Sequence, residues 1–321
     1  MCLLCLLPVA AARPEGARGL VDALWTPAEL AGRREDHART RGSDDPPART
    51  QPRVQLPPLP PEETGNIRRV TPPKGDKPVA LTFDLCELAA RSSGYDAAII
   101  GYLRAHAIPA TFFAGGKWLR SHRERGLQLM ADPLFELGNH AWTHGNFGIM
   151  DMHDMRDQIL WTQAYYEDLR QELLTRARNR GLDAERLVAP ALRFFRLPYG
   201  RCSPEALRLL HSLGLRVIQW DVSAESAGDN SLPGMARHTA DRVRPGSILL
   251  FHANRTPKGS AALLAGIIPI LQQRGFRFVK VGELLELGQA QRFQECYSQR
   301  PGDNLRYDAM FGADGTGRRK P

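Results

Sequence analysis

Short apolar runs alternate with helical patterns through most of this chain of 321 residues. This alternation restricts the fold more than any other feature, because strands that alternate with helices form βαβ units and a parallel sheet. The longest helical stretch is expected at 152–178. About seven strand–helix units predict an α/β fold close to a barrel, with one unit fewer than the usual eight. The candidate strands are 79–84, 110–114, 134–137, 193–196, 215–221, 247–252 and 277–281.

The two ends of the chain have a different character. Residues 1–12 hold an apolar run that closes on Ala10-Ala11-Ala12, a pattern typical of a signal peptide, which predicts a periplasmic or secreted protein. Residues 13–75 contain arginines, acidic clusters and paired prolines, which predict a disordered linker because such a segment buries little apolar surface. The folded domain is therefore expected at 76–290, with a loose tail at 291–321.

Composition argues against a nucleic-acid partner and against a transmembrane segment. The formal net charge is +8, but the basic residues outside the two ends are thinly spread, so we expect no nucleic-acid partner. No run of 18 apolar residues occurs, which predicts that the chain has no transmembrane segment.

Chemically capable side chains stand at the predicted carboxyl ends of the strands, where parallel α/β folds place their functional sites. The first strand ends at Asp84, and the third leads to His140 and His144. The fourth runs into Arg196 and the sixth ends at His252. Scattered core or surface residues would not collect in this way, so the pattern indicates a chemical site.

The spacing of His140 and His144 is a further indication. On a helical turn, residues four apart point the same way and can grip one metal ion. Taken alone, the pair fits a metal site and two unrelated histidines equally well. The other residues at the strand ends favour the metal site.

Four motifs together resemble the polysaccharide deacetylase family. They are Thr82-Phe83-Asp84, the His140/His144 pair, Arg196-x-Pro198-Tyr199-Gly200 and Leu250-x-His252. The resemblance covers roughly residues 78–285. It implies a distorted (β/α)7 barrel, a divalent metal ion, usually zinc (Zn²⁺), and hydrolysis of an acetyl group from an acetylated polysaccharide or cell-wall glycan.

The resemblance also implies a role for each catalytic residue. His140 and His144 would be metal ligands, Asp84 the general base and His252 the general acid. Arg196 would pair with Asp84 and favour its charged form.

A second group would bind the substrate. Pro198 and Tyr199 lie in a fixed loop, whose backbone N–H near Tyr199 could stabilise an oxyanion. Trp220 and Leu250 would shape an apolar pocket for the acetyl methyl group. Plainer interpretations remain open, since Trp220 suits a core position equally well.

The sequence departs from the family pattern at two places. The family usually has two consecutive aspartates in the first motif, and the second binds the metal; here that position is Leu85. Glu87, Asp84 itself or water could take the place of this ligand, because hydrolytic zinc sites usually have three protein ligands. The fourth motif lacks the aspartate that usually tunes the catalytic histidine, and Glu225 is a candidate substitute.

Three cysteines remain after the predicted signal peptide: Cys86, Cys202 and Cys296. Cys86 lies beside the first motif and Cys202 beside the third, and an Arg196–Asp84 pair would bring these loops together. We therefore expect a Cys86–Cys202 disulfide, with two buried thiols as the alternative.

The sequence predicts a metal-dependent hydrolase that removes acetyl groups from an acetylated polysaccharide, with an N-acetyl sugar favoured. Two alternatives stay open. One is a hydrolase of another non-peptide amide. The other is a catalytically inactive glycan-binding module, which the loss of the second aspartate at Leu85 would explain.

Overall fold

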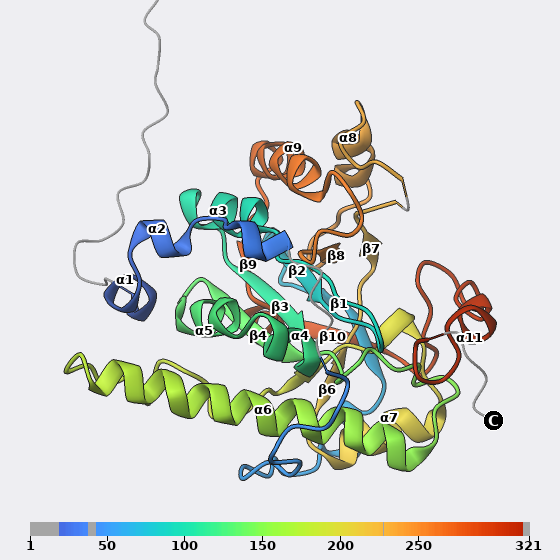
Figure 1. Ribbon diagram of the computed structural model, residues 1–321. Helices are drawn as coiled ribbons and strands as arrows, with labels where there is room; N and C mark the ends of the chain where they lie inside the picture. The colour runs from blue at the N-terminus through green and yellow to red at the C-terminus, as the bar shows by residue number, and fades with distance from the viewer. Residues whose placement is uncertain (1–18, 38–42, 227, 317–321) are drawn as a thin grey trace, which may run out of the picture.

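One ten-stranded sheet lies at the centre of the computed structural model, which describes residues 19–37, 43–226 and 228–316 (Figure 1). The strands are β1 (Asn66–Thr71), β2 (Pro78–Leu85), β3 (Ala110–Ala114), β4 (Phe135–Asn139), β5 (Phe194–Phe195), β6 (Arg216–Ile218), β7 (Val222–Ser223), β8 (Ile248–His252), β9 (Arg277–Val279) and β10 (Gln289–Phe293).

The strand order is β10-β1-β6-β5-β4-β3-β2-β8-β7, and β9 pairs with the start of β2. Neighbouring strands are parallel except β1 and β10, which are antiparallel. The sheet is curled, with β10 and β7 at its two edges. All seven predicted strands are present, and the structure adds β1, β7 and β10 to them.

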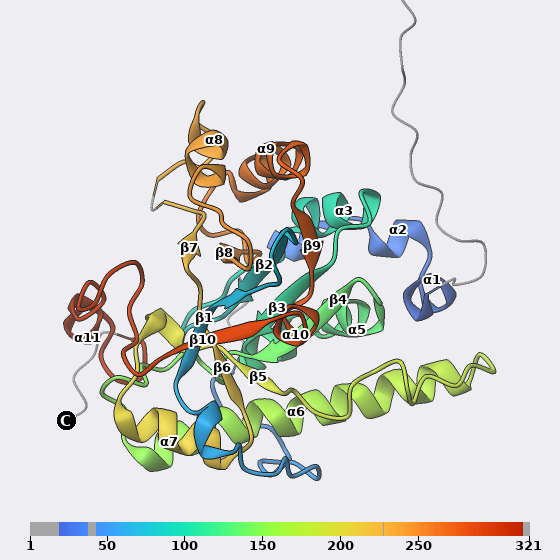
Figure 2. The same ribbon diagram turned by 180° about the vertical axis from the view of Figure 1, so that it is seen from behind.

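Helices cover the sheet on both sides. The longest, α6, has the expected bounds and begins where the Asp151 side chain accepts a hydrogen bond from the backbone N–H of Asp154. It runs along one side of the sheet, and α8 and α9 lie on the other side in both views (Figures 1 and 2). The helices are α1 (Leu20–Leu24), α2 (Pro27–Leu30), α3 (Ala97–Ala105), α4 (Gly116–Ser121), α5 (Arg123–Ala131), α6 (Met152–Arg178), α7 (Pro204–Ser212), α8 (Met235–Ala240), α9 (Ser260–Gln273), α10 (Val281–Glu286) and α11 (Arg306–Phe311), with 3-10 turns at Arg34–His37, Pro61–Glu63 and Pro198–Gly200.

Strand β2 lies at the heart of the core, and every one of its residues is buried. This is typical of a parallel strand covered on both faces. Phe83 stacks against Phe112 and Phe251, with ring centroids 5.1 and 5.3 Å away. Leu85 belongs to the same apolar cluster and is fully buried. The residue that replaces the family's second aspartate is therefore part of the core.

The segment expected to be a disordered linker is ordered where the structure describes it. Trp25 is buried against the domain. Arg49 forms ion pairs with Glu167 and Asp168 of α6, and Glu167 also accepts the backbone N–H of Val54. The prediction is wrong for these residues because polar composition does not reveal the partners that satisfy an extended backbone. The predicted signal peptide at 1–12 lies outside the described residues.

The domain limits also differ from the expected 76–290. Strand β1 lies before this range and pairs with β6 and β10. Strand β10 continues past residue 290, and helix α11 lies within the expected tail. The prediction of a loose tail is therefore wrong for residues 291–316.

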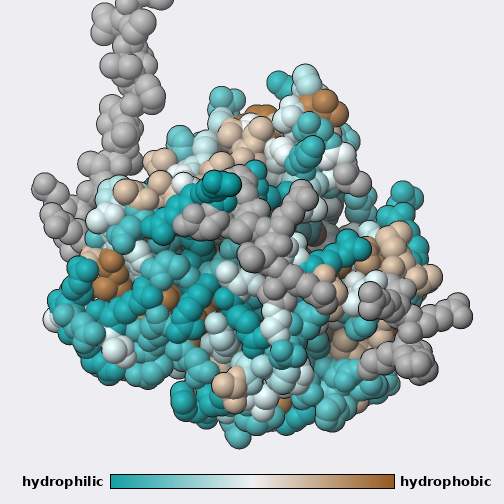
Figure 3. Space-filling view, viewed as in Figure 1, coloured by the Kyte–Doolittle hydropathy of each residue, from teal (hydrophilic) through white to brown (hydrophobic). Residues whose placement is uncertain are grey.

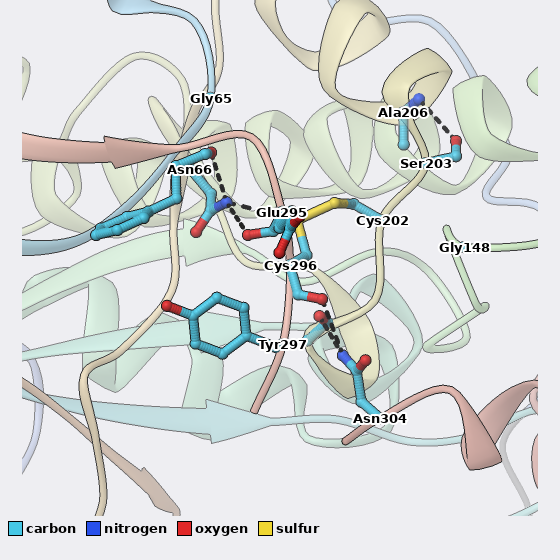
Figure 4. Close-up of a disulfide and its surroundings, with 12 residues drawn as sticks. Gly65, Asn66, Gly148, Cys202, Ser203, Ala206, Glu295, Cys296, Tyr297 and Asn304 are labelled. Atoms are coloured by element: carbon cyan, nitrogen blue, oxygen red, sulfur yellow. Dashed lines mark hydrogen bonds between the residues drawn. A yellow bond between two sulfur atoms is a disulfide. The ribbon is translucent and has the colours of Figure 1, made fainter. Parts of the chain in front are cut away.

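A disulfide joins Cys202 to Cys296 with an S–S distance of 2.01 Å (Figure 4). The expected Cys86–Cys202 bridge is wrong, because Cys86 is a free, buried cysteine. Asn66 on β1 explains the actual pairing, since its side-chain amide donates to the carbonyl oxygens of Phe293 and Glu295. These contacts hold the chain after β10 close to Cys202.

The face of the molecule drawn in Figure 3 is largely hydrophilic, and hydrophobic residues appear on it in small separate groups. Within the described ranges, no helix combines the length and the apolar character needed to cross a membrane.

Gly116 offers a test of how tightly this fold packs. A Cβ atom at Gly116 would lie 2.1 Å from Cε3 of Trp142, whereas a Cβ at Gly101 in α3 would meet nothing within 4 Å. We expect Gly116→Ala to lower the free energy of unfolding by about 1–3 kcal/mol through overpacking. Its control, Gly101→Ala, should raise it by about 0.5–1 kcal/mol. Urea denaturation measures the free energy of unfolding of both variants. A midpoint for Gly116→Ala equal to that of the wild type would contradict the close contact between Gly116 and Trp142.

Candidate active site

The order of the strands brings the predicted site residues together. Strands β5, β4, β3, β2 and β8 are successive parallel neighbours, so their carboxyl ends meet at one edge of the sheet. The register pairs Asp84 of β2 with His252 of β8. It also pairs Asn139 with Phe195, which places His140 beside Arg196.

Asp84 and Arg196 form a buried ion pair. Nη1 of Arg196 lies 2.9 Å from Oδ1 of Asp84, and the two side chains are 0% and 6% exposed. Arg196 also donates to the carbonyl oxygens of Ile218 and Gln219 at 3.1 and 3.2 Å. Burial lowers the pKa of Arg196, and the charge of Asp84 opposes this effect. The predicted contact is present, and it fixes the orientation of the carboxylate.

The second carboxylate oxygen of Asp84 faces His140, with 3.4 Å between Oδ2 and Nε2. Nδ1 of His140 lies 2.8 Å from the carbonyl oxygen of Arg196. Since a carbonyl only accepts, Nδ1 carries the proton and Nε2 keeps its lone pair. Burial lowers the pKa of His140 and, more strongly, that of His144, which favours the neutral imidazoles that bind metals.

The two histidines lie on a loop after β4 and not on the helical turn that their spacing suggested. Ala141 and His144 have φ values of 63° and 60°, in the left-handed region that is rare for residues other than glycine. This backbone still brings the rings together, with centroids 4.7 Å apart. Such strained conformations cluster at functional sites.

The donor set around these histidines fits a metal ion. Nε2 of His140 and Nδ1 of His144 are buried and have no hydrogen-bond partner among the described residues. Cys86 is the third member, and one ligand atom from each residue lies within 4.8 Å of the others. Two imidazoles and a thiol are ligands that zinc accepts in proteins.

Glu87 does not join this group. Its carboxylate accepts hydrogen bonds from the backbone N–H of Ser93 and from Oγ of Ser121, at 3.1 and 2.7 Å. Burial raises its pKa. Glu87 is therefore held by other partners and does not belong to the group of possible metal ligands around the two histidines.

Sequence reasoning missed Cys86 as a candidate ligand. The predicted Cys86–Cys202 disulfide uses this residue instead. The position of Cys86 directly after Leu85, where the family's metal ligand is absent, is the feature of the sequence that indicates a ligand.

His252 contacts Glu225, the candidate substitute for the family's tuning aspartate. Nδ1 of His252 lies 2.6 Å from Oε2 of Glu225, and the other carboxylate oxygen accepts the His252 backbone N–H at 3.2 Å. Burial acts to lower the pKa of His252, but the carboxylates of Glu225 and Asp84 oppose it, with Glu225 the stronger of the two, and the pKa is raised. The His252 side chain is still 31% exposed, which leaves it within reach of a substrate.

The predicted substrate-binding residues lie around this centre. Pro198 is buried, and Tyr199 has a φ of 58°. The Tyr199 ring contacts His144 edge-on, with centroids 4.4 Å apart. Trp220 and Leu250 share a buried apolar cluster, and the guanidinium of Arg196 lies 5.5 Å from the Trp220 ring.

The C-terminal segment supports the Tyr199 loop, which the sequence did not predict. Phe311 of α11 stacks on Tyr199 with centroids 4.6 Å apart. The side chain of Asn304 donates to the carbonyl oxygen of Gly200 at 2.6 Å, and Asp308 forms an ion pair with Arg201 at 2.7 Å. Together with the disulfide, these contacts fix the loop beside His144.

This chain is similar in sequence and fold to known proteins. The profile described as polysaccharide deacetylase matches residues 71–218. A chitooligosaccharide deacetylase of Azorhizobium caulinodans is 28% identical over 191 residues, 56% of this chain and 82% of that protein. A peptidoglycan-N-acetylglucosamine deacetylase of Bacillus cereus is 27% identical over 212 residues, covering 65% and 68% of the two chains.

Solved structures extend the similarity to the fold. A family 4 acetyl xylan esterase from Clostridium thermocellum, in complex with a cobalt ion, overlays with a TM-score of 0.51 at 26% identity. The overlay covers 66% of this chain and 91% of that one. The predicted resemblance and the distorted (β/α)7 barrel fold are confirmed.

The contact between His252 and Glu225 predicts a measurable pKa change. Glu225→Gln removes the charge that raises the pKa of His252, while the opposing effect of burial remains. We expect this pKa to fall by about one pH unit or more, so that His252 loses its proton at lower pH. NMR titration of the ring measures it, with Glu62→Gln on the surface as the control. An unchanged pKa in Glu225→Gln would show that Glu225 does not set it.

Proposed function

We propose that this chain, which resembles the polysaccharide deacetylase family, removes acetyl groups from an N-acetylated glycan by metal-dependent hydrolysis. The observation that carries the proposal is the arrangement at the strand ends. A carboxylate held by Arg196 faces His140, the ring of His144 contacts that of His140, and His252 lies on the adjacent strand. The names of the two relatives support an N-acetyl sugar as the substrate.

The metal would be held by His140 and His144 together with a third donor. We favour zinc among the divalent ions, because the donors include two buried, neutral imidazoles. Such an ion polarises an amide carbonyl and lowers the pKa of a water molecule.

Asp84 is the proposed general base. One of its oxygens is occupied by Arg196, which leaves Oδ2 directed toward His140. A carboxylate in this position can accept a proton from the attacking water. Arg196 acts through Asp84 and is a positioning residue.

His252 is the proposed general acid. The amine of the sugar leaves readily only when its nitrogen is protonated as the C–N bond breaks. Glu225 raises the pKa of His252, so this histidine keeps a proton to donate at higher pH than an ordinary histidine would.

The substrate would lie against the Tyr199 loop. We propose that the backbone N–H near Tyr199 stabilises the oxyanion, with Trp220 and Leu250 against the acetyl methyl group. The left-handed backbone of Tyr199 and its contact with His144 support this placement of the loop beside the metal ligands.

We further propose that the protein acts in the periplasm or after secretion, on a cell-wall or other acetylated glycan. The apolar start of the chain supports export. The Cys202–Cys296 disulfide supports it independently, since such bonds persist in oxidising compartments.

Release of acetate from N-acetylchitooligosaccharides and from peptidoglycan tests the reaction. We expect chelation of the metal to abolish release, and Asp84→Asn or His252→Ala to lower kcat by roughly 10²–10⁴-fold. His153→Ala, a change at an exposed histidine on α6, is the matched control and should leave kcat unchanged. Release that survives chelation and His140→Ala would contradict the metal mechanism.

The alternatives give different results in the same experiment. Release of acetate from acetylated xylan but not from N-acetyl substrates would indicate an esterase, and cleavage of other small amides an amidase. An inactive glycan-binding module, which Leu85 suggested, would bind oligosaccharides in calorimetry without releasing acetate. That last result, obtained with the metal bound, would contradict the hydrolase proposal.

A further inference from the structure

Cys86 lies at the carboxyl end of β2, immediately after the buried Leu85. We propose that the Cys86 thiolate is the third protein ligand of the metal, so that the centre consists of one cysteine and two histidines. The inference rests on the metal dependence in the proposed function. It gives this chain a sulfur ligand where the family pattern has a carboxylate.

The positions of the three donors carry the inference. Cys86, His140 and His144 are 5%, 1% and 8% exposed, and their ligand atoms lie within 4.8 Å of one another. Donor atoms in a tetrahedral zinc site lie roughly 3.3–3.6 Å apart, so small side-chain rotations would close the set. Nε2 of His140 and Nδ1 of His144 are buried without a hydrogen-bond partner among the described residues, which points to a bound ligand at this place.

Neighbouring carboxylates do not compete for this place. Glu87 is held by Ser93 and Ser121. Asp84 is held by Arg196 through Oδ1, and its Oδ2 is the proposed general base, which must stay off the metal to accept a proton from the water. Cys86 is the remaining ionisable donor close to both histidines in the described part of the chain.

Asn254 supports the thiol from the neighbouring loop. Its side-chain amide donates to Sγ of Cys86 at 3.4 Å and to the Cys86 carbonyl oxygen at 3.1 Å. The Asn254 side-chain oxygen in turn accepts the backbone N–H of Thr256 at 3.3 Å. Hydrogen bonds of this kind orient metal ligands and stabilise the charge of a thiolate.

A sulfur ligand has a consequence for the choice of metal. Thiolates favour zinc, cobalt and cadmium, whereas magnesium and calcium prefer oxygen donors. We therefore expect the site to bind zinc or cobalt in the presence of a large excess of magnesium.

Cobalt binding to the metal-free full-length protein tests the ligand directly, because a thiolate bound to Co²⁺ gives a charge-transfer absorption band in the near ultraviolet. We expect the band in the wild type at one Co²⁺ per chain. Cys86→Ser should lack it and bind Co²⁺ at least about tenfold more weakly. Cys86→Asp should bind Co²⁺ through oxygen, also without the band.

Matched controls assign the band to this residue. Cys2, Cys5 and the Cys202–Cys296 disulfide are all retained in Cys86→Ser, and no reductant is added, so any band from them would persist. Glu87→Gln keeps the thiol and should keep the band. Thermal unfolding of each variant shows whether it is folded, and Cys86→Asp keeps the test decisive if Cys86→Ser is not.

Acetate release, measured in parallel, separates this inference from the proposed function. A band that persists in Cys86→Ser, or an unchanged affinity for Co²⁺, would overturn the inference while chelator-sensitive release still supported the hydrolase. Loss of the band in Cys86→Ser, with no acetate release even from the wild type, would support the ligand and contradict the function.

Discussion

The buried ion pair of Asp84 and Arg196 is the interaction on which the site depends. A buried charge is stable only when an opposite charge and hydrogen bonds replace the water it has lost. Removal of one partner of a buried ion pair typically lowers the free energy of unfolding by about 3–5 kcal/mol. Arg196 meets this need with Asp84, with the carbonyl oxygens of Ile218 and Gln219, and with the ring of Phe113 at 4.0 Å. Its own carbonyl oxygen accepts from His140, so one residue orients both the base and a metal ligand.

The two ends of the chain complete the domain around this centre. Strand β1, from the N-terminal part of the chain, extends the sheet, and β10, from the C-terminal part, pairs with β1. The chain beyond β10 then returns through Cys296 and α11 to the Tyr199 loop. Segments with the composition of linkers thus become part of the structure, because the domain supplies partners for their backbone and aromatic groups.

Much of the fold was predictable because strand and helix periods are local properties. The bounds of α6 and of β3 follow directly from apolar spacing, and a parallel sheet then collects strand ends at one edge. The linker and tail predictions failed for the opposite reason. Glu167, which receives Arg49 and the backbone of Val54, is more than a hundred residues away in the sequence, and composition contains no record of such a partner.

The sequence by itself determined the family resemblance, the order of the strands along the chain and the residues that stand at their ends. It also identified Glu225 as the candidate partner of His252. Only the tertiary structure decided which cysteine bonds to Cys202 and which side chain joins His140 and His144. The physical reason is that β2 ends at Leu85. Within a strand, side chains alternate between the two faces of the sheet, so their directions follow from the sequence, but this rule stops where the strand ends. Beyond it, the direction of Cys86 and Glu87 depends on the loops that contact them.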